Sequence, residues 1–318
     1  MVKYINVLLA NTSVSFCHYE NTNNCKNEWI TKELLNKIIN YCKKQKLFIN
    51  YIFPKSSVPI ELLDLIEEIE HFKIAPCNTN INADALIFEF TDLEELKRLN
   101  ASNKKIIILK VNKMGVKSIH KLLKLLVNKF VKITLVLTDV ELYAEEDITT
   151  YKHELEKSKE CLFQQYKDVK DSFPEINFLS DLWFAKQMNN CNAGIDHYTF
   201  APDGKFYICP AFYHNGSKSI GDLLEVQVKN SYLFSLDYAP ICKICDAFHC
   251  SRCVYLNNLL TEEFNTPSSQ QCRLAHIERE YSRQLLEELK QINPLFLQIP
   301  TIKPIKYNDP IEKILRNE

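Results

Sequence analysis

The first 185 residues contain short hydrophobic segments that alternate with amphipathic stretches. The hydrophobic segments are rich in Ile, Leu, Val and Phe, as is typical of strands that are buried on both faces. They are INVLLA (5–10), LFINYIF (47–53), ADALIFEF (83–90), KIIILKV (105–111) and KITLVLT (132–138). Helical periodicity is found near 31–45, 58–71, 92–100 and 116–129, and over 146–173. This alternation predicts an α/β fold with parallel strands, either an open sheet or a partial (β/α) barrel, because five or six units are too few for a closed eight-stranded barrel.

The pattern changes after residue 186. The segment TFAPDGKFYICPAF (199–212) predicts two short strands around a Pro-Asp-Gly turn, and residues 240–273 are loop-like. Ser268 and Gln271 form a capping-box pattern, which predicts the start of a helix. Its apolar face would comprise Leu274, Ile277, Tyr281, Leu285, Leu289 and Ile292.

We therefore expect three parts: a barrel-like part (1–185), a small Cys-rich domain (186–273), and a C-terminal helix with an extended tail (274–318).

The charge of the chain is balanced. Lys and Arg number 39 and Asp and Glu number 40, for a formal net charge of −1. This balance argues against nucleic acid or an anionic membrane as a partner. No segment approaches the about 18 apolar residues of a membrane span, and the N-terminal run is too polar for a signal peptide. A cytoplasmic location is therefore expected.

Glycine and cysteine are distributed unevenly. The 318 residues include only 5 Gly but 12 Cys, whereas a soluble protein has roughly 7% Gly. Gly115 is the one glycine before residue 194, so the first half contains no glycine-rich phosphate-binding loop. The other four glycines and seven of the twelve cysteines lie between residues 191 and 272.

The seven cysteines of this stretch follow the spacing of a metal site. Cys191 is followed after twelve residues by Gly204 and after four more by Cys209. Two Cys-x-x-Cys pairs and a single cysteine come later: Cys242 with Cys245, Cys250 with Cys253, and Cys272. Two thiolates at this spacing reach one metal from a single turn, and clustered cysteines in a reducing compartment bind metal more often than they form disulfides. We predict that all seven ligate metal. A plain zinc site would need only the two pairs.

This pattern resembles the SPASM domain, the C-terminal extension of many radical SAM enzymes that modify ribosomally made peptides. The family motif is a Cys, nine to fifteen residues, Gly-x(4)-Cys, then Cys-x(2)-Cys-x(5)-Cys-x(3)-Cys and a final Cys. Here four residues instead of five separate Cys245 from Cys250, and two instead of three separate Cys250 from Cys253. The resemblance implies two 4Fe–4S clusters, or one, with zinc as the alternative. One cluster would be held by Cys242, Cys245, Cys250 and Cys272. The other would have three thiolates, from Cys191, Cys209 and Cys253, with His197 as a candidate fourth ligand or an open position.

The radical SAM half of the family pattern is missing. Those enzymes use Cys-x(3)-Cys-x(2)-Cys after the first strand and a Gly-Gly-Glu-type segment for SAM. This chain has only Cys17 and Cys25 there, with seven residues between them, and no adjacent glycines. The departure implies a degenerate barrel, so SAM is not expected as a cofactor, and Cys17, His18 and Cys25 are expected to be loop residues or relicts. The segment NTSVSFCHYEN (11–21) and the chain length resemble the maturases that accompany CXXX-repeat precursor peptides.

The favoured hypothesis is an iron–sulfur protein that acts in the maturation of a ribosomally made, Cys-rich peptide. Its partners would be the precursor peptide and a partner maturation enzyme. The alternatives are an active radical SAM enzyme with a divergent cluster site at Cys17 or Cys25, and a zinc-stabilised scaffold or peptide-binding protein. The sequence does not decide whether the chain is itself an enzyme, and it assigns no catalytic residue. Cys42, Cys77 and Cys161 are expected to be core thiols, and DVELYAEED (139–147) a charged helix start.

Overall fold

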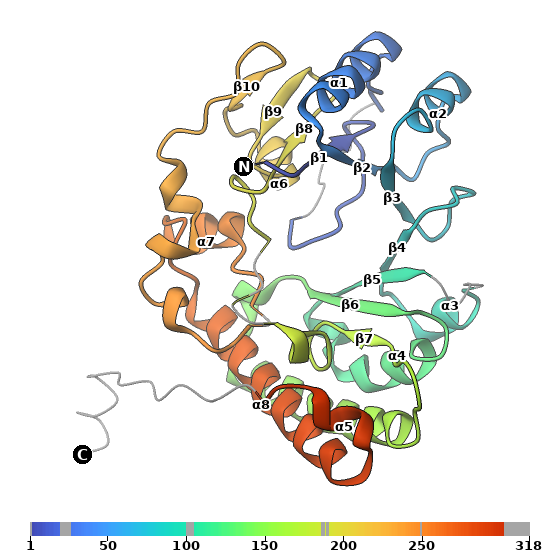
Figure 1. Cartoon of the computed structure of the whole chain (residues 1–318), viewed down its shortest axis with the longest axis vertical. Coiled ribbons are helices and arrows are strands. Elements are labelled where there is room, and N and C mark those ends of the chain that lie inside the picture. Colours follow the sequence, from blue (N-terminus) through green and yellow to red (C-terminus); the bar gives the residue numbers. More distant parts are fainter. Residues whose placement is uncertain are drawn as a thin grey trace.

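The fold is built on one large sheet. The computed structural model describes residues 2–19, 27–99, 105–185, 188, 191–248 and 250–301. Within these residues ten strands are joined in the order β10-β9-β8-β1-β2-β3-β4-β5-β6-β7. The strands are Tyr4–Leu8 (β1), Phe48–Ile52 (β2), His71–Pro76 (β3), Ala85–Glu89 (β4), Ile106–Val111 (β5), Lys132–Leu137 (β6), Glu175–Ile176 (β7), His197–Phe200 (β8), Lys205–Tyr207 (β9) and Gly221–Asp222 (β10). Figure 1 shows them following an open arc from β10 to β7.

The predicted α/β architecture with a largely parallel sheet is confirmed. Every neighbouring pair from β8 through β1 to β7 is parallel, and only the β8–β9 and β9–β10 pairs are antiparallel. The sequential order from β1 to β7 is the order that successive β/α units produce in a barrel. Because β7 and β10 end the sheet without pairing to each other, the barrel is partial.

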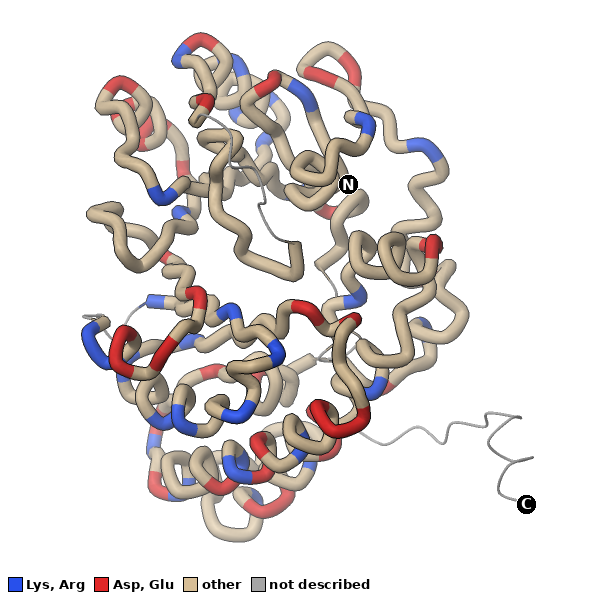
Figure 2. Tube along the Cα trace, turned by 180° about the vertical axis from the view of Figure 1, so that it is seen from behind, with Lys and Arg blue, Asp and Glu red and all other residues tan. Residues whose placement is uncertain are grey.

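The helices connect the strands and follow the barrel. They are Lys32–Gln45 (α1), Ile60–Ile66 (α2), Leu93–Lys97 (α3), Ile119–Leu126 (α4), Glu145–Tyr166 (α5), Pro210–His214 (α6), Val254–Thr261 (α7) and Ser269–Ile292 (α8). In Figure 1, α1 and α2 lie on the outer side of the arc, and α5 and α8 lie side by side below β6 and β7. In the part of the chain that the structure describes, no helix is long and apolar enough to cross a membrane. Figure 2 shows acidic and basic residues intermixed along the outer helices.

Two predicted helices end earlier than expected, and three strands, β3, β7 and β10, were not predicted. The stretch 58–71 was expected to be helical throughout, but α2 ends at Ile66 and β3 begins at His71. Only the last three of the six β3 residues are buried, so HFKIAP lacks the continuous hydrophobic run of the other parallel strands. The helix expected over 146–173 ends at Tyr166. Asn293 Nδ2 donates to the carbonyl oxygens of Tyr166 and Lys167, at 3.3 and 3.1 Å, and so satisfies the end of that helix from a distant segment.

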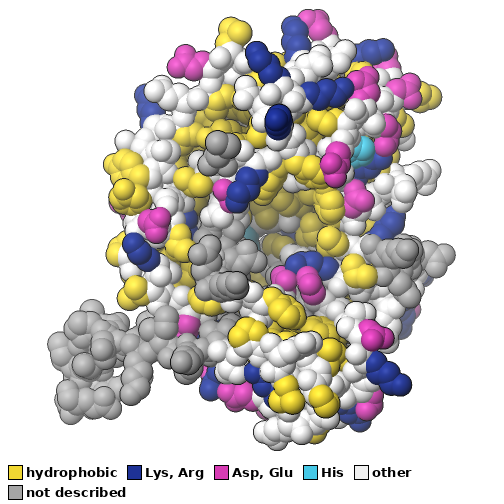
Figure 3. All heavy atoms as spheres, in the orientation of Figure 1, with side chains coloured by type: hydrophobic (Ala, Val, Ile, Leu, Met, Phe, Trp, Pro, Cys, Tyr) yellow, Lys and Arg dark blue, Asp and Glu magenta, His cyan; other side chains and the backbone are white. Residues whose placement is uncertain are grey.

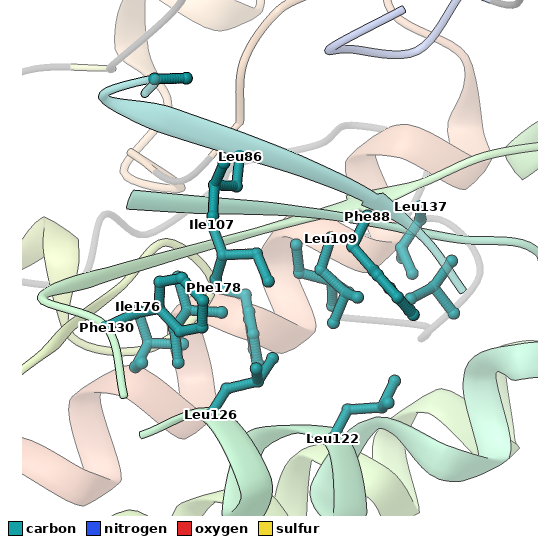
Figure 4. Packing of buried hydrophobic residues seen from close by; sticks show 14 of the residues in the cluster. Leu86, Phe88, Ile107, Leu109, Leu122, Leu126, Phe130, Leu137, Ile176 and Phe178 are labelled. Atoms are coloured by element: carbon teal, nitrogen blue, oxygen red, sulfur yellow. The ribbon is translucent and has the colours of Figure 1, made fainter. Parts of the chain in front are cut away.

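The two faces of the sheet are both buried, against different partners. Residues on the outer face pack against the helices. In Figure 4, Leu122 and Leu126 of α4 point toward Ile107 and Leu109 of β5. The inner face forms a second apolar cluster that includes Leu8, Ile52, Ile74, Ile87, Ile108 and Val136. The segment after β1 lies inside the arc, since Val14 belongs to this inner cluster.

The Cys-rich part of the chain continues the same sheet. The predicted hairpin is confirmed, with β8 and β9 antiparallel. Gly204, in the turn between them, has a φ of +80°, a conformation that side chains other than glycine rarely adopt. β8 then pairs in parallel with β1, so that His197 lies opposite Tyr4. The hairpin is thereby fixed to the first strand of the barrel.

Helix α8 closes the structure against α5. The capping pattern is confirmed, because the Ser268 Oγ accepts from the Gln271 amide at 3.3 Å. Leu285 and Leu289 are fully buried, as the apolar face predicted. In the same interface the Tyr151 hydroxyl of α5 donates to Glu278 of α8. Most of the proline-punctuated tail predicted after this helix, residues 302–318, lies outside the described residues.

We expect the Glu278→Gln variant to be more stable than the unmodified protein above pH 7. Burial raises the pKa of Glu278 from 4.5 to about 7, and the hydrogen bond from Tyr151 lowers it in part. The folded state therefore binds the proton more tightly than the unfolded chain does, so its free energy of unfolding falls as the pH rises between these two values. The loss is roughly 3 kcal/mol, and glutamine avoids it.

Urea unfolding at about pH 5 and about pH 8 measures this difference. The variant should lose less stability than the unmodified protein between the two conditions. The matched control is Glu160→Gln, at an exposed position on α5. An equal loss of stability in the Glu278→Gln variant and the unmodified protein would contradict the raised pKa of Glu278.

Candidate metal centre

Three of the predicted ligands come together from separate elements. Cys209 directly precedes α6 and Cys253 directly precedes α7, so both lie at helix N-termini, where the helix dipole favours a thiolate. Cys191 precedes β8, and its amide donates to the Ser251 carbonyl oxygen at 2.9 Å. All three side chains line one cavity of about 410 Å³ between the barrel and the Cys-rich part.

A fourth cysteine, Cys17, lies with these three. It lines the same cavity and packs against the cluster of buried residues that contains Cys209. Burial, and to a smaller extent the charge of Cys191, raise the pKa of Cys17 to about 12. We refer to Cys17, Cys191, Cys209 and Cys253 as the Cys17 group.

The thiols of the Cys17 group act on one another electrostatically. Burial raises the pKa of Cys209 well above its usual range, and the charges of Cys17 and Cys191 add to the increase. Burial also raises the pKa of Cys253, and the charges of Cys191, Cys17 and Cys209 add to the increase. Cys191 has an exposed surface and lines the cavity. The protein around its thiol still raises its pKa, because it keeps water away from the sulfur. Free thiols here would stay protonated, whereas a metal would deprotonate them.

Backbone amide groups near these thiols oppose the rise in pKa. Those of Ala211 and Phe212 lower the pKa of Cys209, that of Leu256 lowers the pKa of Cys253, and those of Ala193 and Val254 lower the pKa of Cys191. Nearby amide groups stabilise the thiolate form and are a common means by which proteins tune metal–thiolate centres.

The remaining four predicted ligands form a second group. Cys242, Cys245 and Cys250 belong to one small apolar cluster, and Cys272 lies in the first turn of α8. Burial raises the pKa of Cys250 to about 12, and the charges of Cys242, Cys272 and Cys245 raise it further. We refer to these four residues as the Cys242 group.

The Cys242 group is also provided with hydrogen-bond donors. The amide of Ala247 donates to the Cys245 Sγ at 3.3 Å, and the amide of Arg252 donates to the Cys250 Sγ at 3.4 Å. The His276 Nε2 on α8 lies 3.6 Å from the Cys245 Sγ. The loop is tied to the same helix by an ion pair between Asp246 and Arg279.

The plain four-cysteine site would join Cys253 to Cys242, Cys245 and Cys250. Cys250 and Cys253 line the same cavity, whereas the charges that raise the pKa of Cys253 are those of Cys191, Cys17 and Cys209. Among the residues that the structure describes, no three His, Cys, Asp or Glu side chains are arranged to hold a single metal ion. The thiols of each group are therefore neighbours, but they do not surround the position of a single metal ion.

Arg252 lies between the two groups. Its side chain is 1% exposed, and its guanidinium donates to the carbonyl oxygen of Phe234 and to the Asn265 Oδ1. Its Nε has no hydrogen-bond partner among the described residues. Burial lowers the pKa of Arg252, while the charges of Cys242, Cys191 and Cys250 raise it. The negative charge near this cation therefore comes from cysteines of both groups.

His197, the candidate fourth ligand, has different neighbours. It lies on β8, lines the same cavity, and stacks on Tyr4 with ring centroids 4.7 Å apart. Burial lowers its pKa to about 4, and the nearby charge of Asp196 opposes the decrease. No cysteine contributes to that shift.

The other cysteines lie apart from both groups. Cys42 is fully buried in the main core, which confirms that prediction. Cys77 packs against the same core, and Cys161 is half-buried on α5. Cys25 lies outside the described residues.

A second cavity, of about 620 Å³, opens where the parallel strands end. Figure 3 shows a hollow inside the arc of strands, bordered by hydrophobic and charged side chains. The lining is largely polar and includes Thr12, Ser15, Lys55, Glu89, Lys110 and Asn112. The Lys110 ammonium, at the inner end of β5, donates to the Ser15 Oγ at 3.1 Å and to the Tyr19 carbonyl oxygen at 3.4 Å. The hydrophobic strand pattern of KIIILKV gave no sign that its lysine faces inward.

The acidic segment 139–147 serves the fold. Asp147 accepts from the Ala144 amide at 2.7 Å and pairs with Lys113 at 2.8 Å. Asp139 accepts from the Lys113 amide at 3.0 Å. These contacts confirm the expected charged start of a helix.

Comparison with known proteins gives limited information. No protein-family model matches the chain, and no curated protein sequence matches it. Among solved structures, the chain is similar to the crystal structure of Streptococcus suis SuiB bound to the precursor peptide SuiA. The two share 9% sequence identity at a TM-score of 0.46, over 85% of this chain and 76% of that chain. A likeness this distant assigns neither ligand nor activity.

Proposed function

We propose that this chain is an iron–sulfur protein that acts in the maturation of a ribosomally made, Cys-rich peptide and does not itself cleave SAM. The observation that carries the proposal is the gathering of eight cysteines in one region: the Cys17 group lines one cavity together with Cys250, and Cys250 also packs with Cys242 and Cys245 of the Cys242 group. Each group has the number of thiolates that a 4Fe–4S cluster requires. The clusters would supply one-electron transfer when bound.

The order of the ligands supports two clusters. Cys250 and Cys253 are only three positions apart and line the same cavity, yet the charges that act on their pKa values come from different cysteines. In two-cluster ferredoxins, too, the last cysteine of a closely spaced run ligates the other cluster. Such interleaving ties the two centres to one short loop.

The charge on Arg252 supports metal-bound thiolates in both groups. A guanidinium stays protonated in proteins, and a buried charge is costly unless an opposite charge lies near it. The hydrogen-bond partners of Arg252 in the described residues are neutral oxygens, so its charge complement must come from the cysteines. Thiols with raised pKa values carry no charge at neutral pH unless a metal deprotonates them. Arg252 therefore fits a site in which both groups are loaded.

The peptide substrate and the loss of SAM chemistry rest on the sequence. The cysteine spacing resembles the SPASM domain, whose parent enzymes act on ribosomally made peptides. The segment after β1 lacks the three-cysteine motif, and Gly115, the one glycine of the barrel, packs so closely against Phe90 and Val111 that a Cβ would clash with both. The precursor peptide and a partner maturation enzyme are the proposed partners.

Protein purified without oxygen should contain roughly eight iron atoms and roughly eight sulfides per chain. Inductively coupled plasma mass spectrometry and a sulfide assay measure these amounts. Removal of the iron with a chelator should lower the melting temperature, because the thiolates then lose their common partner. Zinc without labile sulfide would instead support the scaffold alternative.

Reduced, iron-loaded protein incubated with SAM should release no 5′-deoxyadenosine. The reason is the absence of the three-cysteine cradle that leaves one iron open for SAM. Liquid chromatography detects the product, and an established radical SAM enzyme treated in parallel is the positive control. Product that disappears in Cys17→Ala would support the divergent radical SAM alternative.

The Arg252→Gln variant should have a more negative cluster midpoint potential, by on the order of 50 mV. Reduction adds negative charge to the cluster, and the variant lacks the cation that stabilises that charge. A redox titration followed by electron paramagnetic resonance measures the shift. Arg283→Gln, whose arginine pairs with Glu280 and Glu287, is the matched control and should leave the potential unchanged. Equal potentials for Arg252→Gln and the control would contradict this role for Arg252.

A further inference from the structure

The loop after β1 reaches the Cys-rich part of the molecule. Cys17 lines the same cavity as Cys191, Cys209 and Cys253, although more than 170 residues separate it from the nearest of them in the chain. It also packs against the buried cluster that includes Cys209. Cys250 also lines the cavity but packs against the cluster that contains Cys242, so the packing places Cys17 with Cys209 and not with Cys250.

The residue after Cys17 fixes this loop to both halves of the structure. The His18 Nδ1 donates to the Leu137 carbonyl oxygen at the end of β6, at 3.1 Å. The His18 Nε2 then accepts from the Ser251 hydroxyl at 3.5 Å. Ser251 lies between Cys250 and Cys253, and its carbonyl oxygen accepts from the Cys191 amide. One imidazole thus connects the loop, the barrel and the cysteine-bearing segment.

The next residue fixes the loop against the helix that begins after Cys209. Tyr19 is buried, and its ring stacks on His214 of α6 with centroids 5.3 Å apart. Its hydroxyl donates to the Val14 carbonyl oxygen at 3.2 Å. The contacts of His18 and Tyr19, the two residues that follow Cys17, hold the Cys17 backbone close to the other three thiols.

We infer that Cys17 is the fourth thiolate ligand of the centre formed by Cys191, Cys209 and Cys253. The inference rests on the proposed iron–sulfur function and specifies one of its centres. The loop after the first strand then closes a cluster of the Cys-rich part instead of holding a separate one in the barrel.

This ligand set limits what the clusters do. With four thiolates in the Cys17 group and four in the Cys242 group, every iron has its protein ligand. No iron is left open to bind a substrate thiolate or SAM. Electron transfer and stabilisation of the fold are the roles that such saturated clusters perform.

Four cysteine-to-serine variants test the assignment. Cys17→Ser and Cys253→Ser each remove a ligand of the Cys17 group, and Cys272→Ser removes one of the Cys242 group. Cys161→Ser is the matched control, since its half-buried thiol on α5 belongs to neither group. Each protein is loaded with iron and sulfide without oxygen, then assayed for iron and by electron paramagnetic resonance.

Cys17→Ser and Cys253→Ser should alter the same spectral component and lower the iron content toward roughly four per chain. Cys272→Ser should alter the other component, and Cys161→Ser should alter neither. Full iron and an unchanged spectrum in Cys17→Ser, with a changed spectrum in Cys253→Ser, would overturn the inference but leave the proposed function intact. Unmodified protein without iron and sulfide would overturn the proposed function itself.

Alkylation of the unmodified protein provides a test that does not depend on folding of the variants. Iodoacetamide labelling is followed by mass spectrometry before and after iron is removed with a chelator. Cys17 should be protected together with Cys253 in the loaded protein and become reactive together with it afterwards. Equal labelling of Cys17 in both states, beside iron-dependent protection of Cys253, would count against its role as a ligand.

Discussion

The burial of charge between the barrel and the Cys-rich part is the constraint on which the rest of the structure depends. Arg252 is 1% exposed, its hydrogen-bond partners among the described residues are neutral oxygens, and the charges that raise its pKa are those of Cys242, Cys191 and Cys250. A buried cation is costly unless an opposite charge lies near it, and a bound metal would supply that charge by deprotonating the thiols. In the proposed function the clusters and the fold therefore stabilise each other, because the fold gathers the thiols and the thiolates would balance its buried cation.

The continuity of the sheet explains how distant cysteines meet. β8 pairs with β1 in parallel, so the hairpin that leads to Cys209 is held in the same sheet as the strand that leads to Cys17. The loops that follow β1 and β9 are brought to the same region, where α6 and α7 each begin directly after a cysteine. A separate Cys-rich domain joined by a linker would not fix these distances, whereas a shared sheet does.

The first loop of the barrel packs against the Cys-rich part. The parallel strands end in a polar cavity that contains an inward-facing lysine, at the place where barrel enzymes carry their chemistry. The segment after β1 is fixed by His18 and Tyr19 against the Cys-rich part. The structure thus combines a polar cavity in the barrel with a first loop that contacts the cysteine-bearing region.

The sequence alone determined the features that depend on near neighbours. The hydrophobic runs predicted the parallel strands, the Pro-Asp-Gly turn predicted the hairpin, Ser268 and Gln271 predicted the start of α8, and the spacing singled out seven cysteines. The tertiary structure decided that Cys17 lines one cavity with Cys253 and that Lys110 faces inward. Propensity and spacing act over a few residues, whereas the meeting of residues more than 200 positions apart depends on the path of the whole chain. The strand β3 and the early end of α5 differed from expectation for the same reason, since pairing with β2 and the Asn293 side chain determine them from outside the segment.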